Sequence, residues 1–325
     1  MLREELSWYR GPITHAHIRY PGEVDRISSG EILQFDHETA LQYLKLLTGR
    51  SNLRITDTNH AMLSLDVDNL EKPESESKEI WREKLINQAS EETAKRIAEI
   101  RRRSNPNIIV GVEVDIIDSQ GGLSLSDECL GGSDFTIASF HRYIWSVFSG
   151  RKHYQPEELI EMYMGTLDNP NVCVLGHPTN LSSKMVGVLK PEDYSPVIKK
   201  MTEKGVAYEI SILKDLSRKD EELTRGVLRI CGEKGTPLVL STDFHNIPDL
   251  IEFGDLPGKE WVDVTEENLK DVFAQNAVIH YSILRRLIRN IDVLRGLDIN
   301  EEQVVNSSDQ RFDDWLNSRK FMFSQ

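Results

Sequence analysis

The chain of 325 residues lacks the features that identify several large classes of protein. Its three cysteines are far apart and form no CxxC pair, so we expect free thiols in a reducing compartment and no disulfide framework. No apolar run approaches the ~18 residues that a membrane span needs. The first residues, MLREELSWYRG, contain no apolar core of a secretory leader. These absences predict a soluble, cytoplasmic protein that has no membrane partner.

Excess positive charge is also missing, because the formal net charge is -14. A strongly acidic chain gains little from nonspecific attraction to phosphate backbones, so long nucleic acid is an unlikely partner. A small anionic substrate in a local basic pocket remains compatible with this charge. The charge does not indicate an oligomeric state.

Residues that commonly bind metal ions occur in six short stretches of the chain. Most of these stretches lie on apolar, β-rich segments. In an α/β barrel, side chains at the ends of successive strands gather at one mouth and can surround metal ions. The pattern therefore predicts a metallohydrolase. The stretches are THAH at 14–17, TDTNH at 56–60, GVE at 111–113, ASFH at 138–141, LGHP at 175–178 and STDFH at 241–245.

Apolar strand-like segments alternate with helical patterns along most of the chain. Such alternation is typical of an α/β fold with a parallel sheet or barrel. A polar stretch at about 66–77 reads as a surface loop, and residues 291–325 as a terminal helical segment of unassigned role. Strands are expected at 12–18, 52–57, 107–117, 135–139, 172–175, 206–210 and 238–240, and helices at 37–49, 79–103, 156–166, 191–204, 218–234 and 265–290.

Two pairs of candidate ligands have the spacing of side chains on one face of a strand. His15 and His17 are two residues apart, as are Asp243 and His245. Each pair alone is weak, since such residues are often structural. Glu113 adds weight because a carboxylate inside an apolar strand is costly to bury unless it is paired or binds a metal. A buried salt bridge is the alternative explanation.

His141 and His177 each follow an apolar strand, at the point where a loop should begin. Singly, each could be an ordinary loop histidine, but the repeated placement favours a shared site. Mixed oxygen and nitrogen ligands suit zinc, manganese or iron better than a metal bound by thiolates. A carboxylate among several histidines suggests a site with more than one metal ion, and two divalent ions close together can activate a water and hold a phosphoryl group.

The ordered motifs resemble those of the PHP (polymerase and histidinol phosphatase) family, from about residue 13 to 255. The resemblance implies a distorted seven-stranded (β/α)7 barrel, which we expect to occupy residues 1–290 with a loop and helix insertion at about 66–103. Residues 291–325 would form a C-terminal helical appendage. The motifs that carry the resemblance are HAH at 15–17, ITD at 55–57, GVEVDI at 111–116, IASFH at 137–141, VLGHP at 174–178, GVAYEIS at 205–211 and LSTDFH at 240–245.

The resemblance also implies which residues bind metal. A third ion, where present, would use His245 and two further histidines. Here the chain departs from the family pattern, because Thr58 stands where the family has a histidine and no histidine soon follows His17. His60, two residues after Thr58, is the candidate replacement. The first ion would be held by His15, His17, Glu113 and Asp243, and the second by Glu113, His141 and His177, with Glu113 shared.

Other polar residues near these motifs are candidates for substrate binding and proton transfer. Arg19 and Arg142 could grip a substrate phosphate through two hydrogen bonds, and a surface or salt-bridging arginine is the plainer alternative for each. Lys184 is a weaker candidate. Asp57 or His245 could protonate the leaving alcohol, which requires hydrogen-bond reach and a suitable pKa. Glu209, in the family's EI-N motif, is interpreted as a supporting or structural residue.

The motifs together predict a metal-dependent phosphoesterase. The most specific form of this prediction is a phosphatase that hydrolyses a small phosphorylated metabolite or nucleotide through a metal-bound hydroxide. A phosphodiesterase or nuclease on the same barrel is one alternative. A metal-bound interaction domain without catalysis is another, since the third set of histidines is altered. The substrate is not specified by the sequence, because it depends on loop geometry and a fold alone does not determine function.

Overall fold

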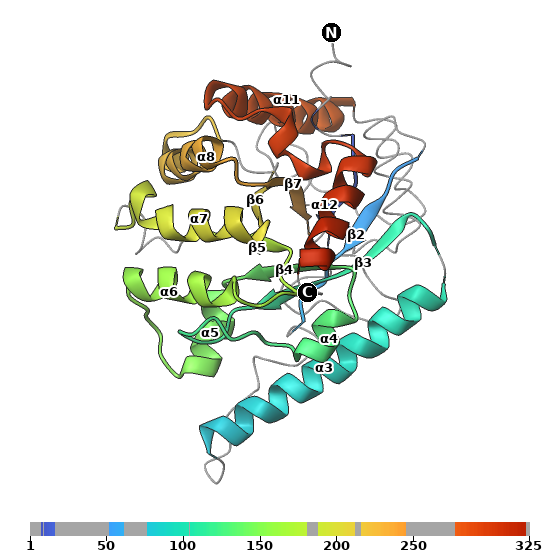
Figure 1. Ribbon diagram of the computed structural model, residues 1–325, viewed down its shortest axis with the longest axis vertical. Coiled ribbons are helices and arrows are strands. Elements are labelled where there is room, and N and C mark those ends of the chain that lie inside the picture. The colour runs from blue at the N-terminus through green and yellow to red at the C-terminus, as the bar shows by residue number, and fades with distance from the viewer. Residues whose placement is uncertain are drawn as a thin grey trace.

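The computed structural model describes residues 8, 10–16, 52–61, 77–103, 105–180, 188–211, 216–244 and 277–322. Seven parallel strands form a closed barrel in which each strand pairs with the next and the last pairs with the first (Figure 1). The predicted distorted α/β barrel is confirmed. The strands are β1 (Ile13–Ala16), β2 (Ile55–Asp57), β3 (Ile108–Asp115), β4 (Phe135–Ser139), β5 (Val174–Gly176), β6 (Ala207–Ser211) and β7 (Leu238–Phe244).

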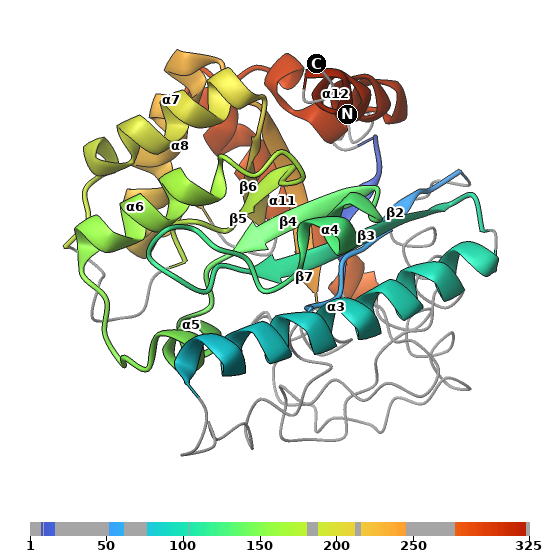
Figure 2. The same ribbon diagram turned by 60° about the horizontal axis from the view of Figure 1, so that its bottom comes forward.

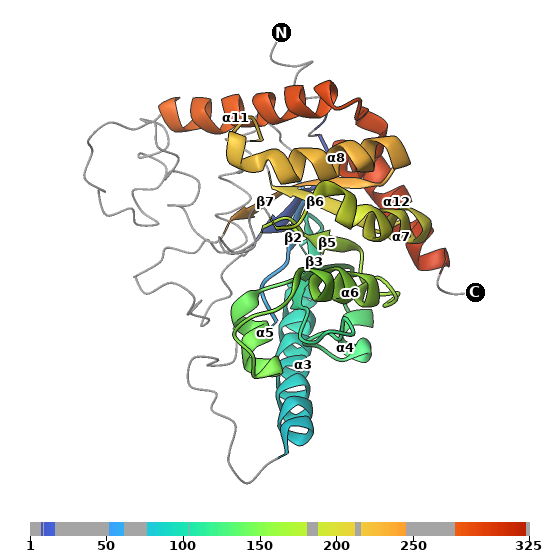
Figure 3. The same cartoon turned by 90° about the vertical axis from the view of Figure 1, so that its left-hand side faces the viewer.

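Helices cover the outside of the barrel, and several lie side by side in chain order. Figures 1 and 3 both show α6, α7, α8 and α11 stacked next to one another. Short 3-10 helices precede α7 and α8 and others lead into α12. The elements are α3 (Lys78–Arg102), α4 (Asp127–Gly131), α5 (Arg142–Ser149), α6 (Pro156–Thr166), η3 (Pro191–Tyr194), α7 (Ser195–Lys204), η4 (Lys219–Glu221), α8 (Glu222–Lys234), α11 (Ala277–Gly296), η5 (Glu301–Gln303), η6 (Val305–Ser307) and α12 (Asp309–Met322).

The predicted boundaries hold best where the local signals are strongest. Ser77 caps α3 by accepting a hydrogen bond from the Ile80 N–H, and arginines occupy its last turn, where cations suit the helix dipole. Figure 2 shows α3 running along the outside of β3. Pro156 begins α6 at a position where its missing N–H costs nothing. The short helices α4 and α5 escaped prediction.

Side chains along each strand point alternately outward, toward the helices, and inward, into the barrel. On β3, Val112 and Val114 face the helices and belong to the larger hydrophobic core, whereas Ile109 lies inside the barrel. With a period of two, Glu113 points inward on the same side as Ile109. On β6, Ala207 lies inside the barrel, so Glu209 also points inward. The carboxyl ends of the strands therefore direct acids into the barrel mouth.

The opposite end of the barrel is closed by α12, which crosses in front of the strands in Figure 1. Phe312 and Trp315 pack against Phe135 inside the barrel, with ring centroids 5.5 and 6.4 Å from it. Arg319 donates to the carbonyls of Lys204, the last residue of α7, and of Val172, two residues before β5. Side chains of α12 thus donate hydrogen bonds to main-chain carbonyls at this end and fill its interior, and the carboxyl end is the open mouth.

Asn306, in η6, links the first strand of the barrel to the last through hydrogen bonds. Its side chain donates to the carbonyls of Pro12 and Leu240 and accepts from the Leu240 N–H. Residues 291–322 therefore pack closely on the barrel, although the division of the chain into a barrel domain and an appendage stays a prediction. The helix expected at 37–49, most of the loop expected at about 66–77 and the first part of the helix expected at 265–290 lie outside the described residues.

Two simpler expectations can be compared with the structure. The three cysteines are buried and free, as their spacing indicated. Within the described ranges, none of the helices combines the length and apolarity that crossing a membrane requires.

Candidate metal centre

Glu113 lies at the centre of a group of imidazoles at the barrel mouth. It is fully buried near the end of β3. Its Oε1 faces the Nε2 atoms of His141 and His177, at 3.6 and 3.4 Å. Its Oε2 faces His15 Nε2 at 3.3 Å, and that nitrogen also lies 3.5 Å from Asp243 Oδ1. The two oxygens of one carboxylate therefore face two separate sets of side chains.

These separations match the distance between two ligands of one ion. Zinc binds nitrogen and oxygen at about 2.0–2.2 Å, so two ligands at a tetrahedral angle lie about 3.3–3.6 Å apart. The contacts of Glu113 with His15, His141 and His177 all fall in this interval. Hydrogen bonds of the same atoms would be shorter, near 2.9 Å. The arrangement therefore fits two ions that share Glu113.

The main chain is bent at three of these residues. His15, His177 and Asp243 have φ angles of 56°, 28° and 48°, in a region of main-chain conformation that residues other than glycine rarely adopt. The pairing register of β1 shifts around His15, and the register of β7 against β1 shifts around Asp243. Such bulges redirect side chains and are common near active sites. Local strain thus accompanies the convergence of the ligand atoms.

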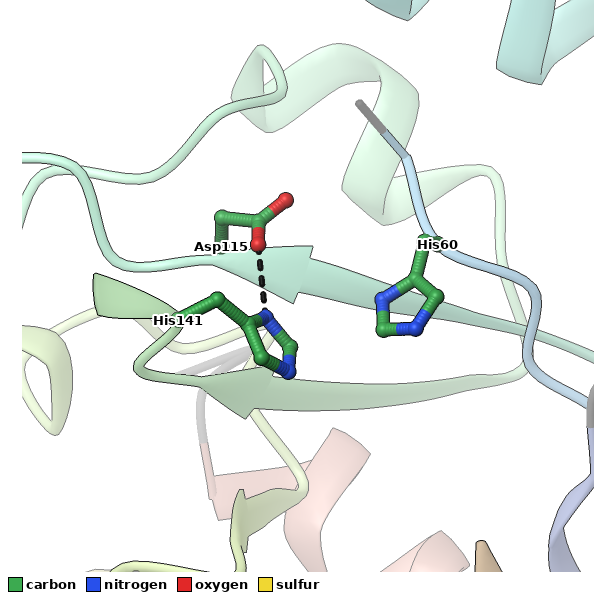
Figure 4. A group of neighbouring side chains, drawn as sticks. All are labelled: His60, Asp115 and His141. Atoms are coloured by element: carbon green, nitrogen blue, oxygen red, sulfur yellow. Dashed lines mark hydrogen bonds and ion pairs between the residues drawn. The ribbon is translucent and has the colours of Figure 1, made fainter. Parts of the chain in front are cut away.

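Asp115 orients the histidine at the end of β4. Its Oδ1 lies 2.7 Å from His141 Nδ1, and Figure 4 shows this contact together with His60 on the other side. Asp115 is held in turn by Ser124, whose hydroxyl accepts from the Asp115 N–H at 3.0 Å. With Nδ1 engaged, His141 directs Nε2 toward Glu113. A carboxylate behind a histidine is the usual means of fixing a metal-binding imidazole.

Glu209 has a comparable role on the opposite side of the mouth. It is buried on β6, where its Oε1 contacts His15 Nδ1 and its Oε2 accepts the main-chain N–H of His177 at 2.7 Å. The rings of His15 and His177 are stacked, with centroids 6.0 Å apart. Glu209 was interpreted from sequence as supporting or structural, and the structure specifies which two residues it contacts.

His60 enters the same group from the segment after β2. Its Nδ1 lies 2.6 Å from Glu113 Oε2, a hydrogen-bonding distance, and its ring meets that of His141 edge-on at 4.9 Å. Thr58 instead packs on Gly111, where an added Cβ would lie 2.7 Å from the Thr58 methyl group. The glycine thus permits the close approach of this segment to β3, which brings His60 within reach of Glu113.

A set of buried hydroxyl groups supports the loop that carries His177. The phenols of Tyr163 and Tyr194 both donate to the Pro178 carbonyl, each at 3.0 Å. The Thr179 hydroxyl lies 3.0 Å from the Tyr208 hydroxyl. Nothing in the sequence pattern indicated these contacts, because the residues come from three different elements. They leave the chain after His177 little freedom to shift.

Charge is concentrated in this mouth. Burial opposes ionisation of His15, but the carboxylates of Glu209, Glu113 and Asp243 outweigh it and raise the pKa of His15 well above its usual range. Burial likewise opposes ionisation of Glu113, yet His60, His15 and His141 hold the pKa of Glu113 well below its usual range. For His141, burial is outweighed by Glu113 and Asp115, and its pKa rises to about 9. Acids and imidazoles therefore stabilise each other's charged forms, as a cation would stabilise the acids.

The predicted catalytic and substrate-binding residues have different surroundings. Asp57 is buried at the end of β2, with Oδ1 3.9 Å from the buried guanidinium of Arg96 on α3. Arg96 was not singled out from sequence, although it lies on the face of α3 that packs against the barrel. Arg142 is exposed at the first position of α5, next to His141. The other predicted residues, His17, Arg19, Lys184 and His245, lie outside the described residues.

Two groups of side chains at the mouth could each hold a metal ion. One consists of Glu113, His141 and His177, and the other of His60, Asp115 and His141. The side chains of His141 and Asp243 are 27% and 23% exposed, so the cluster is reached from solvent. Oxygen and nitrogen ligands of this kind suit divalent ions of intermediate hardness. The identity of the ion is a separate question.

No family model matches the chain. A solved archaeal ribonuclease P with mature tRNA aligns with 79% of this chain and 87% of its own, at 12% identity and a TM-score of 0.34, a likeness too weak to bear on fold or function.

Several curated proteins are similar in sequence. A protein from Acetivibrio thermocellus named "Probable phosphatase" is 26% identical over 214 residues, which are 66% of this chain and 69% of that protein. One from Clostridium acetobutylicum, also named a probable phosphatase, is 25% identical over 181 residues, or 51% of this chain and 67% of that protein. One from Clostridium botulinum strain Hall is 30% identical over 146 residues, or 45% and 55%. The name that these relatives share supports a hydrolase function for the chain.

Proposed function

We propose that the chain is a metal-dependent phosphatase of the PHP type, acting on a small phosphorylated metabolite or nucleotide. The observation that carries the proposal is the position of Glu113, whose two oxygens face His15 on one side and His141 and His177 on the other at ligand spacing. The names of the relatives support the reaction class. The acidic charge of the chain disfavours long nucleic acid and so supports a small substrate.

The residues would divide between two ion positions. One set would be His15, Glu113 and Asp243, together with His17, and the other Glu113, His141 and His177. Two divalent ions held in this way would make a bound water acidic and offset the charge of phosphate oxygens. The ions are taken to be zinc, manganese or iron. His60 already contacts Glu113, so we assign it to this cluster and not to a separate third position.

The protein groups would bind the phosphate and supply a proton. Arg142 is exposed beside His141, where its guanidinium could hold a phosphate oxygen, and Arg19 is the second candidate. Of the two candidates for protonating the leaving alcohol, Asp57 is buried beside Arg96, and contact with substrate would require that pair to open. We therefore favour His245 as the proton donor.

The test is the activity of the full chain after its metal is measured, removed by a chelator and restored. We expect hydrolysis of p-nitrophenyl phosphate, lost on chelation and recovered with manganese or zinc, and we expect a panel of phosphate monoesters to identify better substrates. A chain that binds the ions but leaves every monoester intact would contradict the proposal.

The same assay separates the alternatives. Cleavage of bis(p-nitrophenyl) phosphate or a short oligonucleotide in preference to monoesters would favour a phosphodiesterase. Tight metal binding without any turnover would favour an interaction domain.

A further inference from the structure

One buried carboxylate contacts a histidine of each proposed ion position. Glu209 is only 2% exposed, and its two oxygens have different partners. Oε1 contacts the ring Nδ1 of His15, and Oε2 accepts the main-chain N–H of His177 at 2.7 Å. His15 belongs to the set on Glu113 Oε2, and His177 to the set on Glu113 Oε1. Like Glu113, Glu209 therefore contacts a histidine of each set.

The contact with His15 selects which ring nitrogen is free for an ion. Because Oε1 of Glu209 is an acceptor, Nδ1 of His15 keeps its proton when the ring is neutral. Nε2 then carries the lone pair, and it faces Glu113 Oε2 at 3.3 Å and Asp243 Oδ1 at 3.5 Å. The nitrogen that faces the other ligand atoms is therefore the nitrogen that can bind.

The contact with His177 acts on the main chain. The φ angle of His177 is 28°, which an ordinary residue adopts only when its surroundings impose it. The Glu209 carboxylate accepts a hydrogen bond from the N–H of this residue. The phenols of Tyr163 and Tyr194 donate hydrogen bonds to the carbonyl of the next residue, Pro178. With both sides of the residue fixed, the His177 Nε2 lies 3.4 Å from Glu113 Oε1.

We propose that Glu209 is a positioning residue that couples the two ion positions by fixing one histidine of each. The inference rests on the proposed function, because it requires that both positions hold ions. Asp115 provides the contrast: besides the Ser124 hydroxyl, its carboxylate contacts the ring of His141, which belongs to one position, and it therefore acts on that position. Loss of Glu209 should weaken both positions, and loss of Asp115 only the one that contains His141.

The variant that tests the proposal is Glu209→Gln. A carboxylate offers two acceptor oxygens, and both are used, one by the His15 ring and one by the His177 N–H. An amide of the same shape lacks the charge that strengthens both contacts, and it offers one acceptor and one NH₂ group, so one donor loses its acceptor and the other keeps only a weaker, neutral hydrogen bond. Asp115→Asn is the matched variant on the other side of the mouth. Trp315→Phe removes a buried hydrogen bond to the Gly205 carbonyl at the closed end and serves as the stability control.

The first measurement is zinc binding to the chelator-stripped full chain, by calorimetry for affinity and by native mass spectrometry for stoichiometry. Removing a carboxylate that orients a ligand histidine typically weakens metal binding about 10–100-fold. We expect that loss at both positions in Glu209→Gln and at one position in Asp115→Asn, with no loss in Trp315→Phe. If Glu209→Gln binds two ions as tightly as the wild type, the proposal is wrong.

The second measurement detects the ring contact itself and needs no variant to begin with. In the zinc-loaded wild type with ¹⁵N-labelled histidine, His15 should show a hydrogen-bonded Nδ1–H resonance with zinc on Nε2. Glu209→Gln should shift or abolish that resonance, whereas a general loss of stability in Trp315→Phe should not. A wild-type spectrum in which His15 binds zinc through Nδ1 would overturn the proposal.

Two further outcomes distinguish the failure of this inference from that of the proposed function. If the wild type binds no divalent ion, both fail. If it binds two ions and hydrolyses phosphate esters while Glu209→Gln keeps both affinities, only the coupling fails. Should Glu209→Gln not fold, Glu209→Asp decides, since it keeps both acceptors on a shorter side chain. We expect it to bind both ions more weakly than the wild type, and unchanged affinity at either position would contradict the coupling.

Discussion

The two ends of the barrel are formed by the same seven strands but contain opposite kinds of side chain. At the amino end, aromatic side chains of α12 fill the interior and polar side chains from η6 and α12 satisfy main-chain carbonyls. At the carboxyl end, buried acids and imidazoles face one another and three residues have positive φ angles. The amino end stabilises the fold, whereas the carboxyl end contains strained main chain and buried charged groups. In a barrel of this kind the closed end serves stability and the open end serves chemistry.

The largest effect should come from the centre of the mouth. Glu113→Gln removes the charge that both proposed ion positions share, so we expect the phosphatase rate to fall at least about 10⁴-fold, or roughly 5 kcal/mol of transition-state stabilisation. Metal content should fall with it, as measured by mass spectrometry. Glu91→Gln, an exposed acid on α3 that pairs with Lys95, is the control and should change neither. Near-normal turnover in Glu113→Gln would contradict the expectation that activity depends on the carboxyl end of the barrel.

The opposite end should respond in stability alone. Phe312 is fully buried against Phe135, and truncating a buried phenylalanine costs about 3–5 kcal/mol of unfolding free energy. We expect Phe312→Ala to lower the denaturant midpoint accordingly, while metal stoichiometry and turnover per folded molecule stay as in the wild type. A large change in turnover under folding conditions would show that the closed end also shapes the mouth.

Removal of the metal should destabilise the carboxyl end of the barrel more than the amino end. An ion that binds only the folded chain, supplied at 100 times its dissociation constant, adds about 2.7 kcal/mol of stability. Hydrogen exchange should locate the gain at the ends of β1, β3, β5 and β7, with little change in α12. Equal protection of both ends on metal addition would mean that the ions stabilise the barrel as a whole.

The smallest effect should arise at the edge of the mouth, in the hydroxyl groups that support the His177 loop. Tyr163→Phe removes one of two phenols that donate to the Pro178 carbonyl, and Tyr194 still satisfies that oxygen. We expect a loss of about 1 kcal/mol in chemical denaturation, the usual net contribution of one hydrogen bond. Zinc affinity should change less than threefold. A larger loss of affinity would show that the loop is held less firmly than its contacts indicate.

The order of the strands and much of the helix pattern could be predicted from the sequence, because periodicity is a local property. Glu113 stood out because an acid interrupts an apolar strand, and its central position follows from that alternation. The bulges at His15 and Asp243 could not be predicted, since the first depends on pairing of β1 with β2 and the second on pairing of β7 with β1, more than 200 residues away. The same limit applies to the partners of Glu209. The short helix α5 was missed because its aromatic and β-branched residues have low helix propensity.

Closure of the barrel between β1 and β7 has a consequence for synthesis of the chain. Thr14 pairs with Ser241 and Ala16 with Phe244, so the first strand has no outer neighbour until the seventh has been made. At ribosomal rates of about 5–20 residues per second, His15 precedes Asp243 by roughly 10–45 s. During that interval the nascent chain has an open sheet edge and an incomplete set of donors. The mouth is therefore completed only at the last step of barrel assembly, and a polypeptide arrested before β7 would carry His15 and His60 without Asp243 beside them.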